Sequence, residues 1–159
     1  MTKQDTFEGV KAGLMMYDAL LLGVAEQLGM ERAVALQSKV MEKMGTMRGK
    51  AIKKQVGDKK FDAKSAGALV NPGIEQFGLN IKVVEDNPKR VLTQCIECTY
   101  YAAAHELGVD DKTIEIFCRV GGIKSVDAVV KQLNPKLSAR VVKFRSAPDD
   151  FCEEEIVLE

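Results

Sequence analysis

Three of the four cysteines follow residue 97, each within two residues of an aromatic residue at the edge of a predicted element: Cys98, Cys118 and Cys152. A cysteine is a nucleophile as its thiolate, and a helix N-terminus lowers the pKa of a thiol. Cys98 lies where a β-rich run passes into an Ala-rich helix, so it is our candidate nucleophile. The alternative is a small side chain that fills the junction between strand and helix.

His105 is the one histidine in the sequence and lies seven residues after Cys98. At helical spacing, Cys98, Tyr101 and His105 share one face. An imidazole beside a thiol can take its proton, so we predict Cys98 and His105 as catalytic residues. The alternative for His105 is a half-buried helix residue bonded to a carbonyl. Tyr101, Cys118 and Cys152 are predicted to line a ligand site, and both cysteines also fit simple core packing.

The cysteine spacing does not favour a metal site. Only Cys95 and Cys98 have the Cys-x-x-Cys spacing, and no second pair follows. The sequence also has no Gly-x-Ser-x-Gly elbow, no Gly-rich phosphate loop and no His-Glu-x-x-His helix. We therefore predict neither a metal nor a cofactor.

Length and charge limit the classes of partner. A chain of 159 residues predicts a single domain over residues 1–159. Its 23 basic and 23 acidic side chains balance, which argues against a general attraction to nucleic acid or to a membrane surface. No secretory signal is visible, and the longest apolar run, residues 19–25, is far shorter than a membrane span. We expect a cytoplasmic protein with reduced thiols and a small-molecule partner.

Two long helices are predicted at the start of the chain, over residues 7–28 and 31–56. The second has an apolar stripe that includes Met44 and Met47, which we interpret as a wall for an apolar ligand or as plain core. Glycines inside this helix predict the close approach of another helix or of a ligand. The first helix is apolar on several sides, which favours a homodimer.

The rest of the chain predicts an α+β fold. A third helical segment reaches residue 78 and is expected to break at Asn71-Pro72. Two hairpins follow, at 79–97 and 137–158, separated by helices over 98–134 that are expected to break at Gly121-Gly122. We predict a four-stranded antiparallel sheet with helices packed mainly on one face.

Residues 90–159 resemble the L-2-amino-thiazoline-4-carboxylic acid hydrolase family. The resemblance rests on five runs: Cys98-Thr99-Tyr100-Tyr101, Ala104-His105-Glu106-Leu107-Gly108, Ile116-Phe117-Cys118, Leu133-Asn134-Pro135-Lys136-Leu137 and Asp150-Phe151-Cys152-Glu153. More distantly, the order of helices, hairpin, helices and hairpin resembles the 4-vinyl reductase domain.

The first resemblance implies hydrolytic ring opening of a cyclic amidine-thioether carboxylate to an N-carbamoyl amino acid. Cys98, Cys118 and Cys152 match the positions of that family's cysteines. The second resemblance implies the alternative, a non-catalytic module that binds a small or apolar molecule. Both imply an α+β domain.

Overall fold

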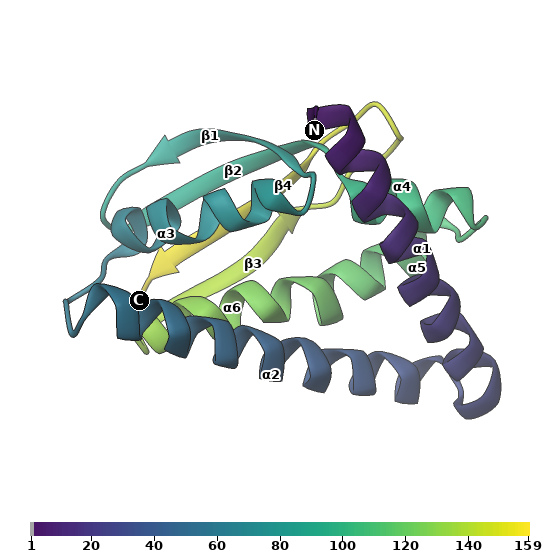
Figure 1. Ribbon diagram of the computed structural model, residues 1–159, viewed down its shortest axis with the longest axis horizontal. Helices are drawn as coiled ribbons and strands as arrows, with labels where there is room; N and C mark the ends of the chain where they lie inside the picture. The colour runs from purple at the N-terminus through teal and green to yellow at the C-terminus, as the bar shows by residue number, and fades with distance from the viewer. Residues whose placement is uncertain (1) are drawn as a thin grey trace.

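The computed structural model describes residues 2–159. Its first two helices, α1 (Lys3–Leu28) and α2 (Met30–Val56), form a V whose point is the single residue Gly29 (Figure 1). Gly29 has a φ of 88°, a backbone conformation that costs glycine little and other residues more. This glycine lets the chain reverse direction between two long helices without a loop.

The sheet is four-stranded and antiparallel, as the sequence predicted, and its strand order is β1-β2-β4-β3. Its strands are β1 (Asn80–Asp86), β2 (Arg90–Glu97), β3 (Leu137–Lys143) and β4 (Cys152–Leu158). Each hairpin supplies two neighbouring strands, and the pairing of β2 with β4 joins the hairpins. Across that join Val91 lies opposite Ile156, and Thr93 lies opposite Glu154, so these side chains share the inner face of the sheet.

Two helices cover this inner face, α3 (Ala63–Gln76) and α6 (Ile123–Leu133) (Figure 1). The main core lies between them and the sheet, and includes Val70, Val91, Val130, Leu137 and Ile156. The predicted α+β class, with helices mainly on one face, is therefore confirmed. Within residues 2–159, no helix is both long enough and apolar enough to cross a membrane.

The expected break at Pro72 is wrong, because α3 continues through this proline. Proline removes the amide that would donate to the carbonyl of Ala68, four residues earlier. Both Ala68 and Pro72 are exposed, so water can bond to that carbonyl instead.

The expected break at Gly121-Gly122 is also wrong. Helix α4 (Thr99–Glu106) is followed by α5 (Asp111–Ile116), and α5 runs through a π-helical segment, η1 (Phe117–Gly122), directly into α6. A Cβ atom on Gly121 would lie 2.1 Å from Cδ of Gln37 on α2. The glycine thus makes room for the Gln37 side chain, and the wider π turn lets the helix continue past it.

The predicted apolar stripe of α2 does not face the core. Gly45 and Gly49 pack against α6 so closely that a Cβ on Gly45 would lie 2.1 Å from the Ser125 carbonyl oxygen. This contact confirms the close helix approach predicted from the glycines. It also turns Met44 and Met47 outward, with 56% and 64% of their surfaces exposed.

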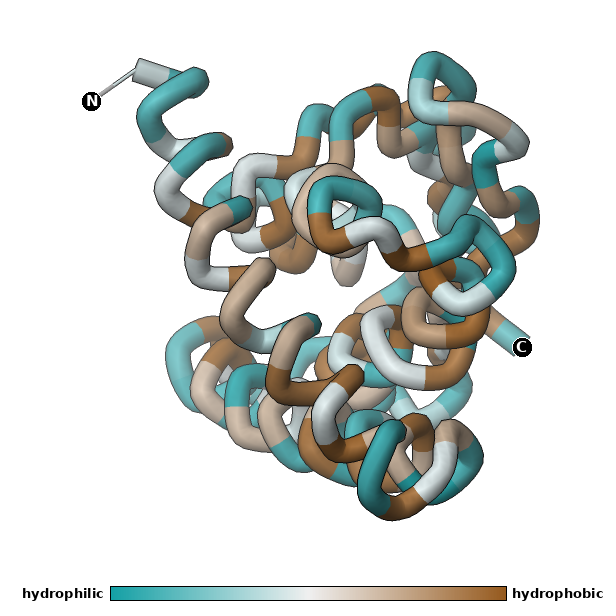
Figure 2. Tube along the Cα trace, turned by 90° about the vertical axis from the view of Figure 1, so that its right-hand side faces the viewer, coloured by the Kyte–Doolittle hydropathy of each residue, from teal (hydrophilic) through white to brown (hydrophobic). Residues whose placement is uncertain are grey.

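Other apolar side chains are exposed on α1 and at the point of the V, the end that faces the viewer in Figure 2: Met16, Leu20, Leu28 and Met30. Their exposure provides the apolar surface that the predicted homodimer would use. The homodimer itself stays a prediction.

Candidate functional site

Cys98 is the N-cap residue of α4, immediately after β2 ends at Glu97. The backbone N–H of Tyr101 donates to the Cys98 sulfur over 3.4 Å. The pKa of Cys98 is lowered, first by a hydrogen bond with the neighbouring Cys95 thiol and then by the Tyr101 amide, while burial acts against both. The predicted position at a helix N-terminus therefore favours the thiolate of this cysteine.

Arg145 places a cation beside the cysteines. Its side chain is 4% exposed, and its guanidinium donates to the carbonyls of Cys95 and Ile96 over 3.1 and 3.3 Å. The same group lies 4.6 Å from the centre of the Tyr101 ring. Nε of Arg145 has no hydrogen-bond partner among residues 2–159, so it can still donate to a ligand.

Cys152 lies directly opposite Cys95 on the neighbouring strand. Its sulfur accepts a hydrogen bond of 3.4 Å from the backbone N–H of Arg145. The four cysteines are free thiols. Cys152 therefore belongs to the same group of side chains as Cys95 and Arg145.

Cys118 approaches this group from η1. It packs, as Cys98 does, against the buried cluster of Tyr101, Ala104 and Ile114. Burial raises the pKa of Cys118 well above its usual value, and the charges of Cys98, Glu154 and Cys152 raise it further. Cys118 is thus a neutral thiol that faces the more acidic Cys98.

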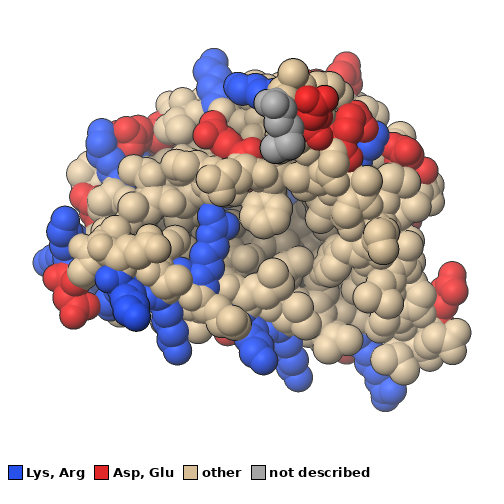
Figure 3. Space-filling model, in the orientation of Figure 1, with Lys and Arg blue, Asp and Glu red and all other residues tan. Residues whose placement is uncertain are grey.

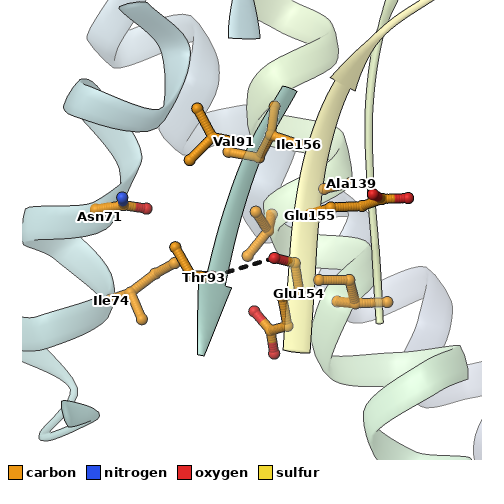
Figure 4. A pocket seen from close by; sticks show the side chains of 10 residues that line it. Asn71, Ile74, Val91, Thr93, Ala139, Glu154, Glu155 and Ile156 are labelled. Carbon is orange, nitrogen blue, oxygen red and sulfur yellow. Dashed lines mark hydrogen bonds between the residues drawn. The ribbon is translucent and has the colours of Figure 1, made fainter. Parts of the chain in front are cut away.

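Glu154 brings a carboxyl group to the inner face of the sheet. It lines a cavity of about 10 Å³ between α3, α6 and the sheet, together with Asn71, Ile74 and Thr93 (Figure 4). Thr93 donates to the backbone carbonyl of Glu154 over 3.2 Å, which leaves the carboxyl group free. Burial raises the pKa of Glu154 to about 7, so near neutral pH it can both give and accept a proton.

His105 is not brought to the Cys98 thiol. The seven residues between them correspond to about 10 Å along a helix, and His105 is exposed. Its ring stacks on Tyr101 with centroids 5.7 Å apart. The group that can exchange protons beside the cysteines is therefore Glu154.

Met44 and Met47 also lie apart from the cysteines, because α2 buries its glycine face instead of its methionine face. Tyr101, Cys98, Cys118 and Cys152 do come together. Within residues 2–159, no group of three or more His, Cys, Asp and Glu side chains is arranged to hold a metal ion.

Sequence reasoning singled out neither Arg145 nor Glu154. The alternation along the last strand placed Glu154 on the inner face with Cys152 and Ile156, which was the available signal. Arg145 had no such signal, because an arginine in the loop after a strand usually lies in water.

The profile of the family described as L-2-amino-thiazoline-4-carboxylic acid hydrolase matches residues 9–151. The chain belongs to this family. A search of curated proteins finds no match.

Two solved structures share the fold of this chain. One is the phenol-responsive sensory domain of the transcription activator PoxR with phenol, 15% identical, with a TM-score of 0.60 over 91% of this chain and 74% of that one. The other is trafficking protein particle complex subunit 3 from Naegleria fowleri, covalently bound to palmitic acid. It is 13% identical, with a TM-score of 0.60 over 95% of each chain. At these low sequence identities, the similarity to the two structures shows a shared fold and nothing more.

Proposed function

We propose that this protein is a hydrolase that opens a small cyclic amidine carboxylate, such as L-2-amino-thiazoline-4-carboxylic acid, with Cys98 as the nucleophile. The observation that carries the proposal is the Cys98 sulfur at the start of α4, where the Tyr101 amide donates to it. Membership of the hydrolase family supports the same chemistry.

In the first step, the Cys98 thiolate adds to the amidine carbon and the ring C–S bond breaks. Protonated Glu154 gives its proton to the ring sulfur, which leaves as a thiol but stays attached through the rest of the substrate. Water then attacks the same carbon, and the Glu154 carboxylate takes a proton from it. The bond to Cys98 breaks, so the products are an N-carbamoyl amino acid and the free thiolate, with one water consumed.

Arg145 is suited to hold the substrate carboxylate. Its side chain is anchored by two carbonyls at the end of β2, and its Nε is still free to donate. A hydrogen bond between guanidinium and carboxylate is among the stronger ones in proteins. This contact would orient the ring with its amidine carbon toward Cys98.

Substrate entry requires a movement, because the cavity beside Glu154 has room for about one water molecule. Asn71 and Ile74 reach it from α3 (Figure 4). Asn71 precedes Pro72, where α3 lacks one backbone hydrogen bond. Bending of α3 at this point would widen the space over the inner face of the sheet.

The test is hydrolysis of L-2-amino-thiazoline-4-carboxylic acid, measured as release of free thiol and of the N-carbamoyl product. We expect Cys98→Ala to reduce kcat/KM by about 10³-fold or more, and Glu154→Gln by about 10²-fold. The matched control is Glu153→Gln, on the outer face of the same strand, which should keep the wild-type rate. A wild-type protein without turnover, or a Cys98→Ala variant at the wild-type rate, would refute the proposal.

The second candidate is a non-catalytic module for a small apolar ligand. It is supported by the shared fold of the phenol-bound sensory domain and of the subunit bound to palmitic acid. In that case phenol or palmitic acid would raise the melting temperature of the wild-type protein and of Cys98→Ala alike, and the ring-opening assay would give no product.

A further inference from the structure

A second group of polar side chains is buried where α1, α2 and α4 meet. It consists of Tyr17 and Asp18 of α1, Gln37 of α2 and Tyr100 of α4. Gln37 Nε2 donates to the Tyr100 hydroxyl over 3.1 Å. Asp18 is 0% exposed and Gln37 is 2% exposed, so water does not reach either of them from the surface.

Four atoms of this cluster have no hydrogen-bond partner within 3.5 Å among residues 2–159: the Tyr17 hydroxyl, both carboxylate oxygens of Asp18 and Gln37 Oε1. Buried polar groups in proteins are nearly always paired, and an unpaired one destabilises the fold. Four unpaired atoms in one place therefore indicate a partner from outside the chain.

The chemistry of these atoms defines that partner. Three of the four are acceptors and the fourth is a hydroxyl, so the partner must supply several donors. No positive side chain is among the causes of the Asp18 pKa shift: burial raises this pKa to about 7, and a weak hydrogen bond with the Tyr100 hydroxyl opposes the rise. A cation would supply the missing charge as well as the donors.

We propose that the Tyr17–Asp18–Gln37–Tyr100 cluster is a binding site for a small amidinium-type cation. A planar amidinium places two parallel N–H groups on a carboxylate, here that of Asp18, and keeps further N–H groups for other acceptors. Gln37 Oε1 and the Tyr17 hydroxyl are such acceptors. This site goes beyond the proposed function, because it does not require Cys98 to react.

The backbone around the cluster is shaped for the Gln37 side chain. A Cβ on Gly121 of η1 would lie 2.1 Å from Gln37 Cδ, so only glycine leaves the amide in place. Cys118 lies on the same segment, and the charges of both Asp18 and Glu154 raise its pKa. The cluster is therefore next to the cysteine group. From outside, the face bounded by α1, α2 and α3 is hollowed between these helices (Figure 3).

The probe is acetamidinium, titrated into the full chain by calorimetry at pH 8.0 and at pH 5.5. We expect binding at pH 8.0 that weakens at least tenfold at pH 5.5, because the cation requires the Asp18 carboxylate. Tyr17, Tyr100 and Cys118 face Asp18, and their pKa values are raised, so they stay neutral over this range. Glu154 titrates in the same range, and Glu154→Gln should keep the pH dependence.

Asp18→Asn should abolish binding at both pH values, while Glu26→Gln, an exposed carboxylate on the same helix, should bind as the wild type does. Gly121→Ala displaces Gln37 and leaves Asp18 intact, and we expect it to weaken binding at least tenfold. This variant tests the site even if Asp18→Asn does not fold. Wild-type protein that does not bind acetamidinium, or binds neutral acetamide equally well, would overturn the site. Equal affinity in Asp18→Asn would overturn it too. These outcomes are independent of turnover by Cys98.

Discussion

The Arg145 guanidinium lies 4.6 Å from the centre of the Tyr101 ring, inside the protein and next to two cysteines. The ring face attracts the cation, and the carbonyls of Cys95 and Ile96 accept its N–H groups. This arrangement ties the loop after β3 to the end of β2 and to the start of α4, which are the elements that position Cys98.

We therefore predict that Arg145→Gln lowers the free energy of unfolding by about 2–4 kcal/mol, because the carbonyls of Cys95 and Ile96 lose a charged donor that is itself buried. Urea denaturation followed by circular dichroism measures the change. Arg32→Gln, an exposed arginine on α2, is the control and should change stability by less than about 0.5 kcal/mol. An equally small change in Arg145→Gln would show that the contact does not support the fold.

Asp18 should make stability depend on pH. Burial raises the folded-state pKa of Asp18 from its ordinary value of 3.8 to about 7, so the folded state binds a proton more tightly than the unfolded chain. The contribution of Asp18 to the free energy of unfolding is therefore greatest below about pH 4, and it falls as the pH rises to about 7.

Asp18→Asn removes this dependence, so we predict that the variant is more stable than the wild type at pH 8 by up to about 4 kcal/mol. The difference should shrink toward zero near pH 4. Thermal unfolding of both proteins from pH 4 to pH 8 provides the measurement. The pKa of Glu154 is also raised, so Glu154 makes the stability of both proteins depend on pH in the same way. Its effect cancels when the variant is compared with the wild type. A constant difference across this range would contradict the raised pKa.

Gly45 should be intolerant of alanine despite its helical position. In an open helix, Gly→Ala stabilises by about 1 kcal/mol, but here the Cβ would lie 2.1 Å from the Ser125 carbonyl oxygen. We predict that Gly45→Ala lowers the free energy of unfolding by about 1–3 kcal/mol, because α2 and α6 must separate.

The control is Gly13→Ala on α1, where nothing lies within 4 Å of the added atom. This change should stabilise the protein. If both variants gain stability in urea denaturation, the packing of α2 on α6 is looser than the structure shows.

Periodicity predicted the helices, the hairpins and their antiparallel pairing, because each of these depends on local patterns of apolar residues. The orientation of α2 could not be predicted from those patterns. Small residues let α6 approach the Gly45 face more closely than the methionine face, and this tertiary contact outweighed the apolar stripe. The same applies at Pro72, where exposure of Ala68 removed the reason for a break.

At the candidate site, the sequence predicted the cap position of Cys98 from the strand-to-helix transition. It did not predict that His105 would be exposed and stack on Tyr101, since a shared helix face says nothing about which end of the helix is buried. A single aspartate within the apolar run of the first helix was a signal for the Asp18 cluster. Its partners outside the first helix come from two other segments, α2 and α4, so the cluster was visible only in the folded chain.

The central claim is that Cys98 attacks the substrate, and the most direct test is the mass of the intact protein during turnover. We predict that rapid acid quenching traps a species heavier by one whole substrate molecule, since ring opening releases nothing. Peptide mapping should place this adduct on Cys98. Product formation without any adduct, or an adduct on Cys95, Cys118 or Cys152 instead, would contradict the account.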